Sequence, residues 1–323
     1  MKTLLIDGDF LLKRGDKGAK WVIFDQQKKG ALYNFVFTIK GLITTFDITK
    51  VVVFWDSDAV KWRKEKYPFY KDHRDKEVDE DFQYQKFRIK QYLEELFIRQ
   101  VESGSSEADD TIAYYVQNTQ EECIIYTGDR DLCQLINPKT KLYFPDKKIL
   151  MDQQNFSAFF NGLKLENFVL QKILIGCSTD NVAGIKGLGE KTLHKQFPQF
   201  LEETLTKERF LEIVNGQKET KQLKIHNNIL YGETKNGEYG FDSLYELNRS
   251  LVDLSNPILD QDIIEELDLV LNQELNPEGR SMENLYRMFT EDGIDGLIPK
   301  SEDGWFNWFK PFNKIIEAET IKI

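Results

Sequence analysis

Seven carboxylates lie where strands are expected to end or helices to begin, and their side chains are suited to binding a divalent metal ion. They are Asp7, Asp56, Glu107, Asp109, Asp110, Asp129 and Asp131. Short β-branched runs precede Asp7, Asp56 and Asp129, and such runs are typical of buried strands in a parallel sheet. Because ligands bind at the carboxyl ends of parallel strands, we expect these side chains to face one cleft.

Several like charges in one cleft favour a bound cation. Clustered carboxylates repel one another and lose hydration, and a divalent ion offsets both costs. Oxygen ligands without a His or Cys cluster favour Mg²⁺ or Mn²⁺. The alternative is ordinary turn or helix-capping chemistry, which Asp often provides after a strand. That alternative explains any single residue of the set. It poorly explains four groups together, which are Asp7, Asp56, Glu107 with Asp109 and Asp110, and Asp129 with Asp131.

The elements that must position these carboxylates alternate between strand and helix. The expected strands are 4–7, 51–56, 123–128 and 142–144, and the expected helices are 30–47 and 107–116. From residue 197 onward the pattern is mostly helical. The predicted fold class is therefore α/β, with a mostly parallel central sheet flanked by helices and a helical C-terminal extension.

The composition limits the class of protein. The 323 residues suffice for one large or two medium domains, and 43 Lys and Arg against 54 Asp and Glu give a net charge of −11. This acidic balance argues against a generic basic nucleic-acid binder, although metal ligands account for part of it. Three cysteines without metal-type spacing favour a reducing compartment. With no apolar run of membrane-spanning length and a strand directly after Met1, we expect a cytoplasmic protein with no membrane partner.

A basic and aromatic segment begins near residue 61. Its cations include the candidate phosphate contacts Arg63, Lys64 and Lys66. Lys and Arg neutralise phosphates without reading sequence, and interleaved aromatic residues stack on bases. The alternative is a solvated charged helix face.

A glycine-punctuated segment follows Asp180. Glycines let the backbone approach a phosphate, and the N–H groups at the start of the next helix bind it. The candidate contacts here are Lys186, Gly187, Gly189, Lys191 and Thr192. A plain helix–turn–helix loop is the alternative.

Six motifs occur in an order that resembles the 5′-nuclease family, which includes flap endonucleases and the 5′→3′ exonuclease domain of bacterial DNA polymerase I. The motifs are Leu5-Ile6-Asp7-Gly8, Val53-Phe54-Trp55-Asp56, Tyr70-Lys71-x-x-Arg74, Glu107-Ala-Asp-Asp110, Thr127-Gly128-Asp129-Arg-Asp131-Leu132 and Asp180-Asn181-Val-Ala-Gly184-Ile-Lys-Gly187-Leu-Gly189. They lie between residues 4 and about 195. The helical, Asn- and Leu-rich remainder is most similar to the T-even phage ribonuclease H branch.

The resemblance implies a 5′-nuclease or PIN-like fold in two domains. A nuclease core at 1–175 would include a basic helical arch at about 61–100. A helical C-terminal domain at 176–323 would contain a helix–two-turn–helix unit at about 176–196. In the family that unit grips duplex DNA and often carries K⁺ on backbone carbonyls.

The resemblance also implies two Mg²⁺ or Mn²⁺ ions. Asp7, Asp56, Glu107 and Asp109 would belong mainly to the first ion. Asp129 and Asp131 would lie between the ions or at the second, with Asp180. Asp110 would act through water or, equally, cap the following helix. Two neighbouring ions suit phosphodiester hydrolysis because together they stabilise the attacking and leaving oxygens.

In the family, the arch also supplies groups that act on the substrate. Lys71 and Arg74 would face the scissile phosphate and stabilise its developing charge, and Tyr70 would stack on the terminal base. The implied activity is a Mg-dependent 5′→3′ exonuclease and flap endonuclease with ribonuclease H activity, removing RNA primers during phage DNA replication. The implied substrates are branched or nicked duplex DNA, RNA–DNA hybrids and 5′ single-stranded flaps. We expect a monomer, with a single-stranded-DNA-binding or other replication protein as a candidate partner of the C-terminal region.

One position departs from the family pattern. Cys177 stands where the family uses a carboxylate at the second metal, and a protonated thiol is a poor Mg²⁺ ligand. Either the second site is weakened, or Cys177 only packs as a small hydrophobic residue. The alternative function is therefore a DNA-end or flap-binding protein with impaired catalysis. A dinucleotide-binding enzyme is more distant, because no G-x-G-x-x-G follows the first strand.

Overall fold

A six-stranded sheet forms the centre of the molecule in the computed structural model, which describes residues 1–19, 21–57, 62–73, 80–221, 224–272, 278–301 and 303–320. In spatial order its strands are β5 (Arg99–Glu102), β4 (Lys50–Trp55), β1 (Lys2–Asp7), β6 (Glu122–Tyr126), β7 (Thr140–Phe144) and β8 (Ile149–Met151). The first five run parallel, and β8 is antiparallel to β7. The predicted mostly parallel sheet is confirmed.

The strands are buried on both faces, as their continuous apolar runs predict. Successive side chains of a strand point to opposite faces. In β1, Leu4 and Ile6 join one hydrophobic core, and Leu5 joins the other. Each face of the sheet therefore needs a layer of helices to cover it.

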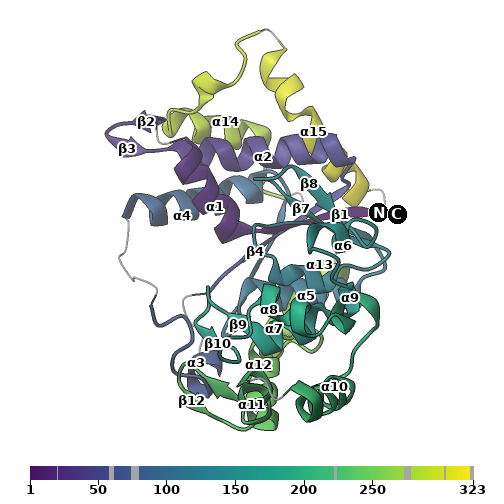
Figure 1. Cartoon of the computed structure of the whole chain (residues 1–323). Coiled ribbons are helices and arrows are strands. Elements are labelled where there is room, and N and C mark those ends of the chain that lie inside the picture. The colour runs from purple at the N-terminus through teal and green to yellow at the C-terminus, as the bar shows by residue number, and fades with distance from the viewer. Residues whose placement is uncertain are drawn as a thin grey trace.

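One layer is built from both ends of the chain (Figure 1). Its helices are α1 (Gly8–Gly18), α2 (Gly30–Phe46), α4 (Glu80–Glu95), α14 (Met282–Glu291) and α15 (Gly304–Thr320). A small hairpin of β2 (Ile23–Phe24) and β3 (Gln27–Lys28) joins α1 to α2, and the 3-10 helix η3 (Asp295–Leu297) follows α14. Because α14 packs on α4 and α15 packs on α2, the end of the chain completes the covering of this face.

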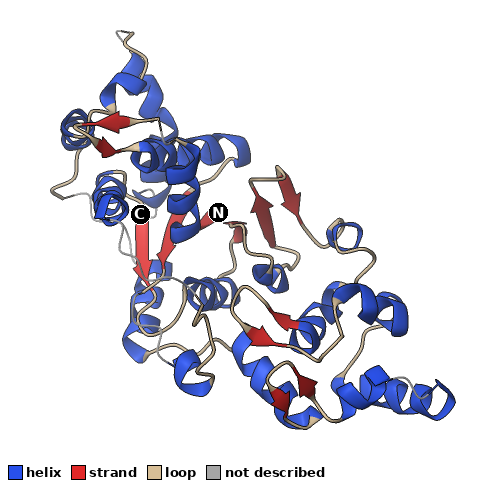
Figure 2. Cartoon of the chain, turned by 60° about the vertical axis from the view of Figure 1, so that its left-hand side comes forward, coloured by secondary structure: helices blue, strands red, loops and turns tan. Residues whose placement is uncertain are grey.

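The helices between β5 and residue 272 lie on the other side of the sheet and share one hydrophobic core with it, and two small hairpins lie among them (Figure 2). The helices are α5 (Ala108–Asn118), η1 (Asp131–Leu135), α6 (Phe156–Phe159), η2 (Leu165–Asn167), α7 (Phe168–Ile175), α8 (Glu190–Gln196), α9 (Gln199–Glu202), α10 (Lys207–Lys221), α11 (Lys224–Leu230), α12 (Phe241–Val252) and α13 (Gln261–Asn272). The hairpins are β9 (Gly176–Cys177) with β10 (Val182–Ala183) and β11 (Glu233–Thr234) with β12 (Gly237–Glu238). The short helix α3 (Trp62–Lys66) is tied to α12 by a hydrogen bond from Arg63 to the Leu251 carbonyl oxygen at 3.3 Å. The division into domains at residue 175 stays a prediction.

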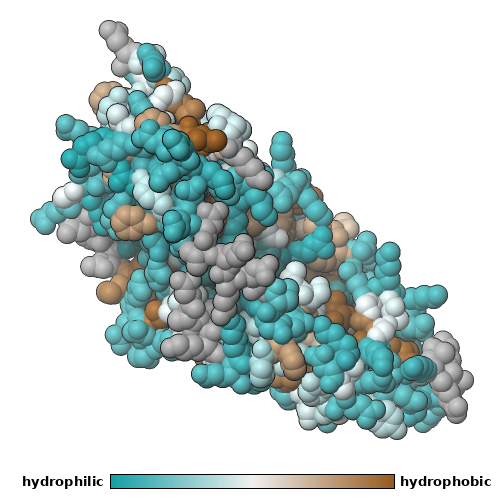
Figure 3. Space-filling view, turned by 90° about the vertical axis from the view of Figure 1, so that its left-hand side faces the viewer, coloured by the Kyte–Doolittle hydropathy of each residue, from teal (hydrophilic) through white to brown (hydrophobic). Residues whose placement is uncertain are grey.

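The surface of the face in Figure 3 is largely hydrophilic, with hydrophobic residues in small separate groups. None of the described helices is both long and apolar enough to cross a membrane.

Candidate active site

The strand register brings the predicted carboxylates to one edge of the sheet. Asp7 ends β1 opposite Phe54 of β4, so Asp56 lies just beyond the neighbouring strand end. Asp129 follows β6, which pairs with the other side of β1. A cavity of about 680 Å³ opens at this edge. The predicted ligands among its lining residues are Asp7, Asp56, Glu107, Asp109, Asp129 and Asp131.

Local hydrogen bonds fix the orientation of these carboxylates. Asp7 caps α1, accepting the Phe10 N–H at 2.9 Å, and it also accepts the Thr127 hydroxyl at 3.1 Å. Asp56 accepts the Ala108 N–H at 2.9 Å, which ties the end of β4 to the start of α5. These bonds leave acceptor capacity on each carboxylate, because an ionised carboxylate has about four lone-pair sites.

The electrostatics of the cluster fit a divalent cation. Burial and the nearby Asp56 raise the pKa of Asp7 to about 7, and burial and Asp131 raise the pKa of Asp129 to about 6. Burial, followed by Asp129 and Asp7, also raises the pKa of Asp109. Repulsion between close carboxylates produces such shifts, and a cation relieves it. The described residues thus offer oxygen ligands at unfavourable charge density, which suits Mg²⁺ or Mn²⁺.

Glu107 differs from its neighbours because cations surround it. Lys71 forms an ion pair with one carboxylate oxygen, and the Tyr70 hydroxyl donates to the other at 2.8 Å. Burial opposes ionisation of Glu107, but Lys71 and Arg63 together lower its pKa. Lys71 also lies 3.6 Å from Asp180, so it links this side of the cavity to the loop between β9 and β10.

Three residues with predicted roles at the site, Arg63, Asp110 and Tyr70, are buried. Arg63 is buried and holds Asp110 through two bonds of 2.5 and 2.7 Å, so its guanidinium is not presented to a phosphate. Asp110 also accepts the Glu107 N–H at 3.1 Å, the capping role that was the alternative to a metal ligand. The Tyr70 ring is only 2% exposed, which leaves no open face for stacking on a base. Sequence spacing does not reveal this burial.

The other cations of this segment remain candidates. Lys64 and Lys66 are exposed on α3, and the neighbouring Phe69 is 47% exposed. Arg74 lies outside the described residues. Lys71 is in the cavity wall, as a group acting on the scissile phosphate must be.

Asp131, Cys177 and Asp180 form a second group of candidate ligands. The ligand atoms of Asp131, Cys177 and Asp180 all lie within 4.8 Å of one another. The Cys177 thiol donates to Asp180 at 3.4 Å. Burial, followed by Asp131 and Asp180, raises the pKa of the thiol to about 11, so it stays protonated at neutral pH. Cys177 also packs in a small apolar cluster with Tyr70. The structure is therefore consistent both with a weakened second metal site and with a packing role for Cys177.

Further polar residues of the site were not predicted from the sequence, among them Lys172, Asp9 and Lys86; Lys13, Arg130 and Asp146 also line the cavity. Lys172 of α7 lies 2.6 Å from Asp131, and no local pattern separates it from an ordinary helix residue. Asp9 and Lys86 form an ion pair at the cavity edge with N···O 3.0 Å. Asp9 follows Asp7 by two residues, and this spacing could have indicated that Asp9 belongs to the site.

The glycine-rich segment between α7 and α8 is compact. A Cβ on Gly184 would lie 2.0 Å from the Ile175 carbonyl oxygen, so glycine is required for this approach to α7. Gly187 has φ +79°, which also favours glycine. Lys186, Gly187, Gly189 and Lys191 are exposed, and Thr192 is half-buried. None of these five lines the carboxylate cavity, so any contact they make with nucleic acid lies away from the reacting phosphate.

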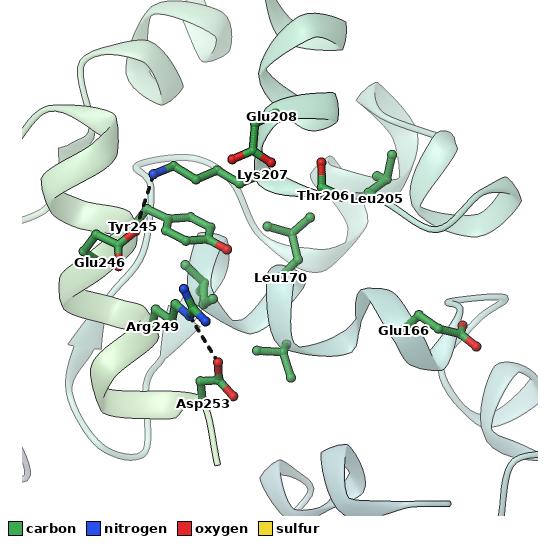
Figure 4. A pocket seen from close by; sticks show the side chains of 12 residues that line it. Glu166, Leu170, Leu205, Thr206, Lys207, Glu208, Tyr245, Glu246, Arg249 and Asp253 are labelled. Atoms are coloured by element: carbon green, nitrogen blue, oxygen red, sulfur yellow. Dashed lines mark hydrogen bonds and ion pairs between the residues drawn. The ribbon is translucent and has the colours of Figure 1, made fainter. Parts of the chain in front are cut away.

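Another cavity, of about 410 Å³, lies between α7, α10 and α12 (Figure 4). Lys207 and Arg249 reach into it, but Glu246 and Asp253 pair with them at 3.5 and 3.3 Å. Because these cations are already compensated, this cavity is poorly suited to phosphate, and we place the chemistry at the sheet edge.

Comparison with known proteins identifies the family of the chain. Residues 2–161 match the family model described as the 5′-3′ exonuclease N-terminal resolvase-like domain. A 5′-3′ exonuclease of Halalkalibacterium halodurans is 33% identical over 204 residues, which cover 58% of this chain and 67% of that protein. The chain belongs to the 5′-nuclease family. A thermostable DNA polymerase I of Thermus caldophilus is 30% identical over 231 residues, or 70% of this chain, but the match covers only 27% of the polymerase.

The 5′-nuclease fold is also found in a solved structure. The D15 flap endonuclease of bacteriophage T5, described as a pseudo-enzyme–product complex with DNA and metal ions, matches with a TM-score of 0.61. The match covers 98% of this chain and all of the phage chain at 18% identity, which shows a shared fold.

Proposed function

We propose that this protein is a structure-selective 5′ nuclease, acting as a 5′→3′ exonuclease and flap endonuclease. The observation that carries the proposal is the convergence of carboxylates from the ends of β1, β4 and β6 and the start of α5 in one cavity. Lys71 and Lys172 lie in the same cavity wall and supply positive charge beside the carboxylates. Together these groups suit an anionic phosphodiester and the metal ions that hydrolyse it.

Two Mg²⁺ or Mn²⁺ ions are the proposed cofactors. When bound, they would generate the attacking hydroxide and stabilise the leaving oxygen. Asp7, Asp56 and Asp109 would hold the first ion, with Glu107 close by. Asp129 would lie between the ions, with Asp131 and Asp180 toward the second. When the substrate binds, Lys71 would leave its ion pair with Glu107 and stabilise the charge developing on the scissile phosphate.

The proposed substrates are branched or nicked duplex DNA, 5′ single-stranded flaps and RNA–DNA hybrids. Lys64 and Lys66 would contact the single strand, and the segment from Lys186 to Thr192 would grip the duplex, with K⁺ on its backbone carbonyls. The biological role would be removal of RNA primers, a ribonuclease H activity, during phage replication in the host cytoplasm. We propose a monomer whose C-terminal region contacts a single-stranded-DNA-binding or other replication protein.

The test is cleavage of defined substrates. A 5′-labelled flap, a nicked duplex and an RNA–DNA hybrid are incubated with the protein in Mg²⁺, in Mn²⁺ or in excess chelator. We expect short 5′ products with either metal and none with chelator. A protein that binds the flap but leaves all three substrates intact in both metals would contradict the proposal.

One observation favours a second candidate, a DNA-end or flap-binding protein with impaired catalysis. The protonated Cys177 thiol occupies the ligand group formed with Asp131 and Asp180. If it prevents binding of the second ion, the flap would be bound without being cut. The same assay separates the candidates, because binding is scored by gel shift alongside cleavage.

A further inference from the structure

We propose that Asp9 and Lys86 are a pair of positioning residues that hold Asp56 in place and set the net charge of the first metal site. Neither residue was among the expected ligands. The inference rests on the proposed function, since it concerns the metal site of the same cavity.

Contacts on both sides of the pair support this role. Asp9 is 6% exposed and accepts the Asp56 backbone N–H at 2.8 Å. Lys86 reaches both Asp9 oxygens, at 3.0 and 3.2 Å, and donates to the Asp56 carbonyl oxygen at 3.3 Å. The main chain of Asp56 is thus held through its N–H by Asp9 and through its C=O by Lys86. Its side chain is left to face the cavity.

The pair also fastens α4 to the end of β4. Gln85, beside Lys86, accepts the Ala31 N–H at 2.9 Å and so ties α4 to α2. One turn along, Arg88 binds Asp292 at 2.5 Å. The helix that carries Lys86 is therefore held by contacts with two other elements. A side chain on a rigid helix can hold its partner, here Asp56, in one position.

Charge decides how the pair would affect the metal. Asp9 lines the same cavity as Asp7 and Asp56, so its charge acts on the ligands of the first metal site. Lys86 compensates Asp9 directly. Removing the Asp9 charge alone would leave an ammonium group beside the site, which opposes cation binding. Removing both charges would restore the balance.

The experiment compares three variants with the wild-type protein. Asp9→Asn keeps an acceptor for the Asp56 N–H, Lys86→Gln keeps a donor, and the third variant combines the two changes. Lys90→Gln is the matched control, since Lys90 lies one turn along α4 and pairs with Glu102, which is 54% exposed. Mn²⁺ affinity is measured by calorimetry without DNA, and the Mg²⁺ needed for half-maximal flap cleavage is measured separately.

We expect Asp9→Asn to weaken Mn²⁺ binding about tenfold and the double variant to return within about threefold of wild type. Lys86→Gln should bind Mn²⁺ at least as tightly as wild type but cleave more slowly, because Asp56 is held less firmly. Lys90→Gln should change neither value. A merely structural role would lower affinity in all three variants, with no recovery in the double variant.

Wild-type Mn²⁺ affinity in Asp9→Asn, or no recovery in the double variant, would overturn the inference while leaving the nuclease proposal intact. A wild-type protein that neither binds Mn²⁺ nor cleaves would overturn both. If Asp9→Asn does not fold, Lys86→Met decides the question, because weaker Mn²⁺ binding in that variant contradicts the charge argument.

Discussion

At the scale of single residues, the charge in the cavity depends on both its carboxylates and the cations that face them. Burial, followed by repulsion from neighbouring carboxylates, raises the pKa values of Asp7, Asp109 and Asp129. Burial alone would raise the pKa of Glu107, but Lys71 and Arg63, with the hydrogen bond from Tyr70, lower it. Single substitutions should therefore separate metal binding from nucleic-acid binding.

Asp129→Asn is expected to abolish cleavage, with a rate loss of about a thousandfold or more, because it removes a ligand between the two proposed ions. DNA binding, measured by gel shift, should be unchanged or tighter because repulsion of the phosphates falls. Asp242→Asn is the control, since Asp242 is 81% exposed and does not line the cavity. Cleavage by Asp129→Asn at the wild-type rate would refute the assigned ligand.

Cys177→Asp is expected to lower the Mg²⁺ concentration for half-maximal cleavage by about tenfold, because a carboxylate replaces a protonated thiol beside Asp131 and Asp180. Cys177→Ser controls for loss of the thiol without gain of charge. Metal titrations of the three proteins make the comparison. Identical Mg²⁺ dependence would mean that Asp180 suffices and that Cys177 serves only in packing.

At the scale of elements, α4 depends on the last part of the chain. Asp292, which follows α14, is 1% exposed and accepts hydrogen bonds from Tyr84, Tyr92 and Arg88 on α4. These three residues share one helical face, since they are four residues apart. Residue Lys86 of the same helix reaches the candidate active site, so α14 supports that site from a distance.

Asp292→Asn should lower the free energy of unfolding by about 3 kcal/mol, because it leaves Arg88 without its buried partner. Urea unfolding followed by circular dichroism measures the change. Glu291→Gln is the matched control: Glu291 is adjacent, also pairs with Arg88 and is 53% exposed, so it should cost under about 1 kcal/mol. Equal effects of the two substitutions would show that burial of Asp292 is unimportant.

At the scale of the whole molecule, the carboxylate cavity costs stability that bound metal should restore. A carboxyl whose pKa is raised on folding binds more protons in the native state than in the unfolded chain. Its contribution to stability is therefore complete below the unfolded pKa and is lost as pH rises through the folded pKa. For Asp7 and Asp129 that window runs from about 4 to about 7. Glu107 has the opposite sign, but its lowered pKa places its effect below this window.

The melting temperature of the metal-free protein should therefore fall between pH 5 and pH 8. Added Mg²⁺ should raise the melting temperature more at pH 8 than at pH 5. Calorimetric melting in chelator and in Mg²⁺ measures both effects. Asp129→Asn should show a shallower pH dependence in chelator. A metal-free melting temperature that rises steadily over this range would contradict the raised pKa values.

The sequence by itself determined four of the six strands of the central sheet and its mostly parallel order, and it indicated that the carboxylates gather at one edge; β5 and β8 were not predicted. Apolar runs specify buried strands, and Asp residues at strand ends must meet where parallel strands end together. Tertiary structure alone decided which charges face the cavity. Arg63 and Tyr70 read as exposed contacts yet are buried, whereas Lys172 and Lys86 reach the carboxylates from helices distant in sequence. Local spacing fixes the face of an element on which a side chain lies, but its partner across the fold depends on how the elements pack.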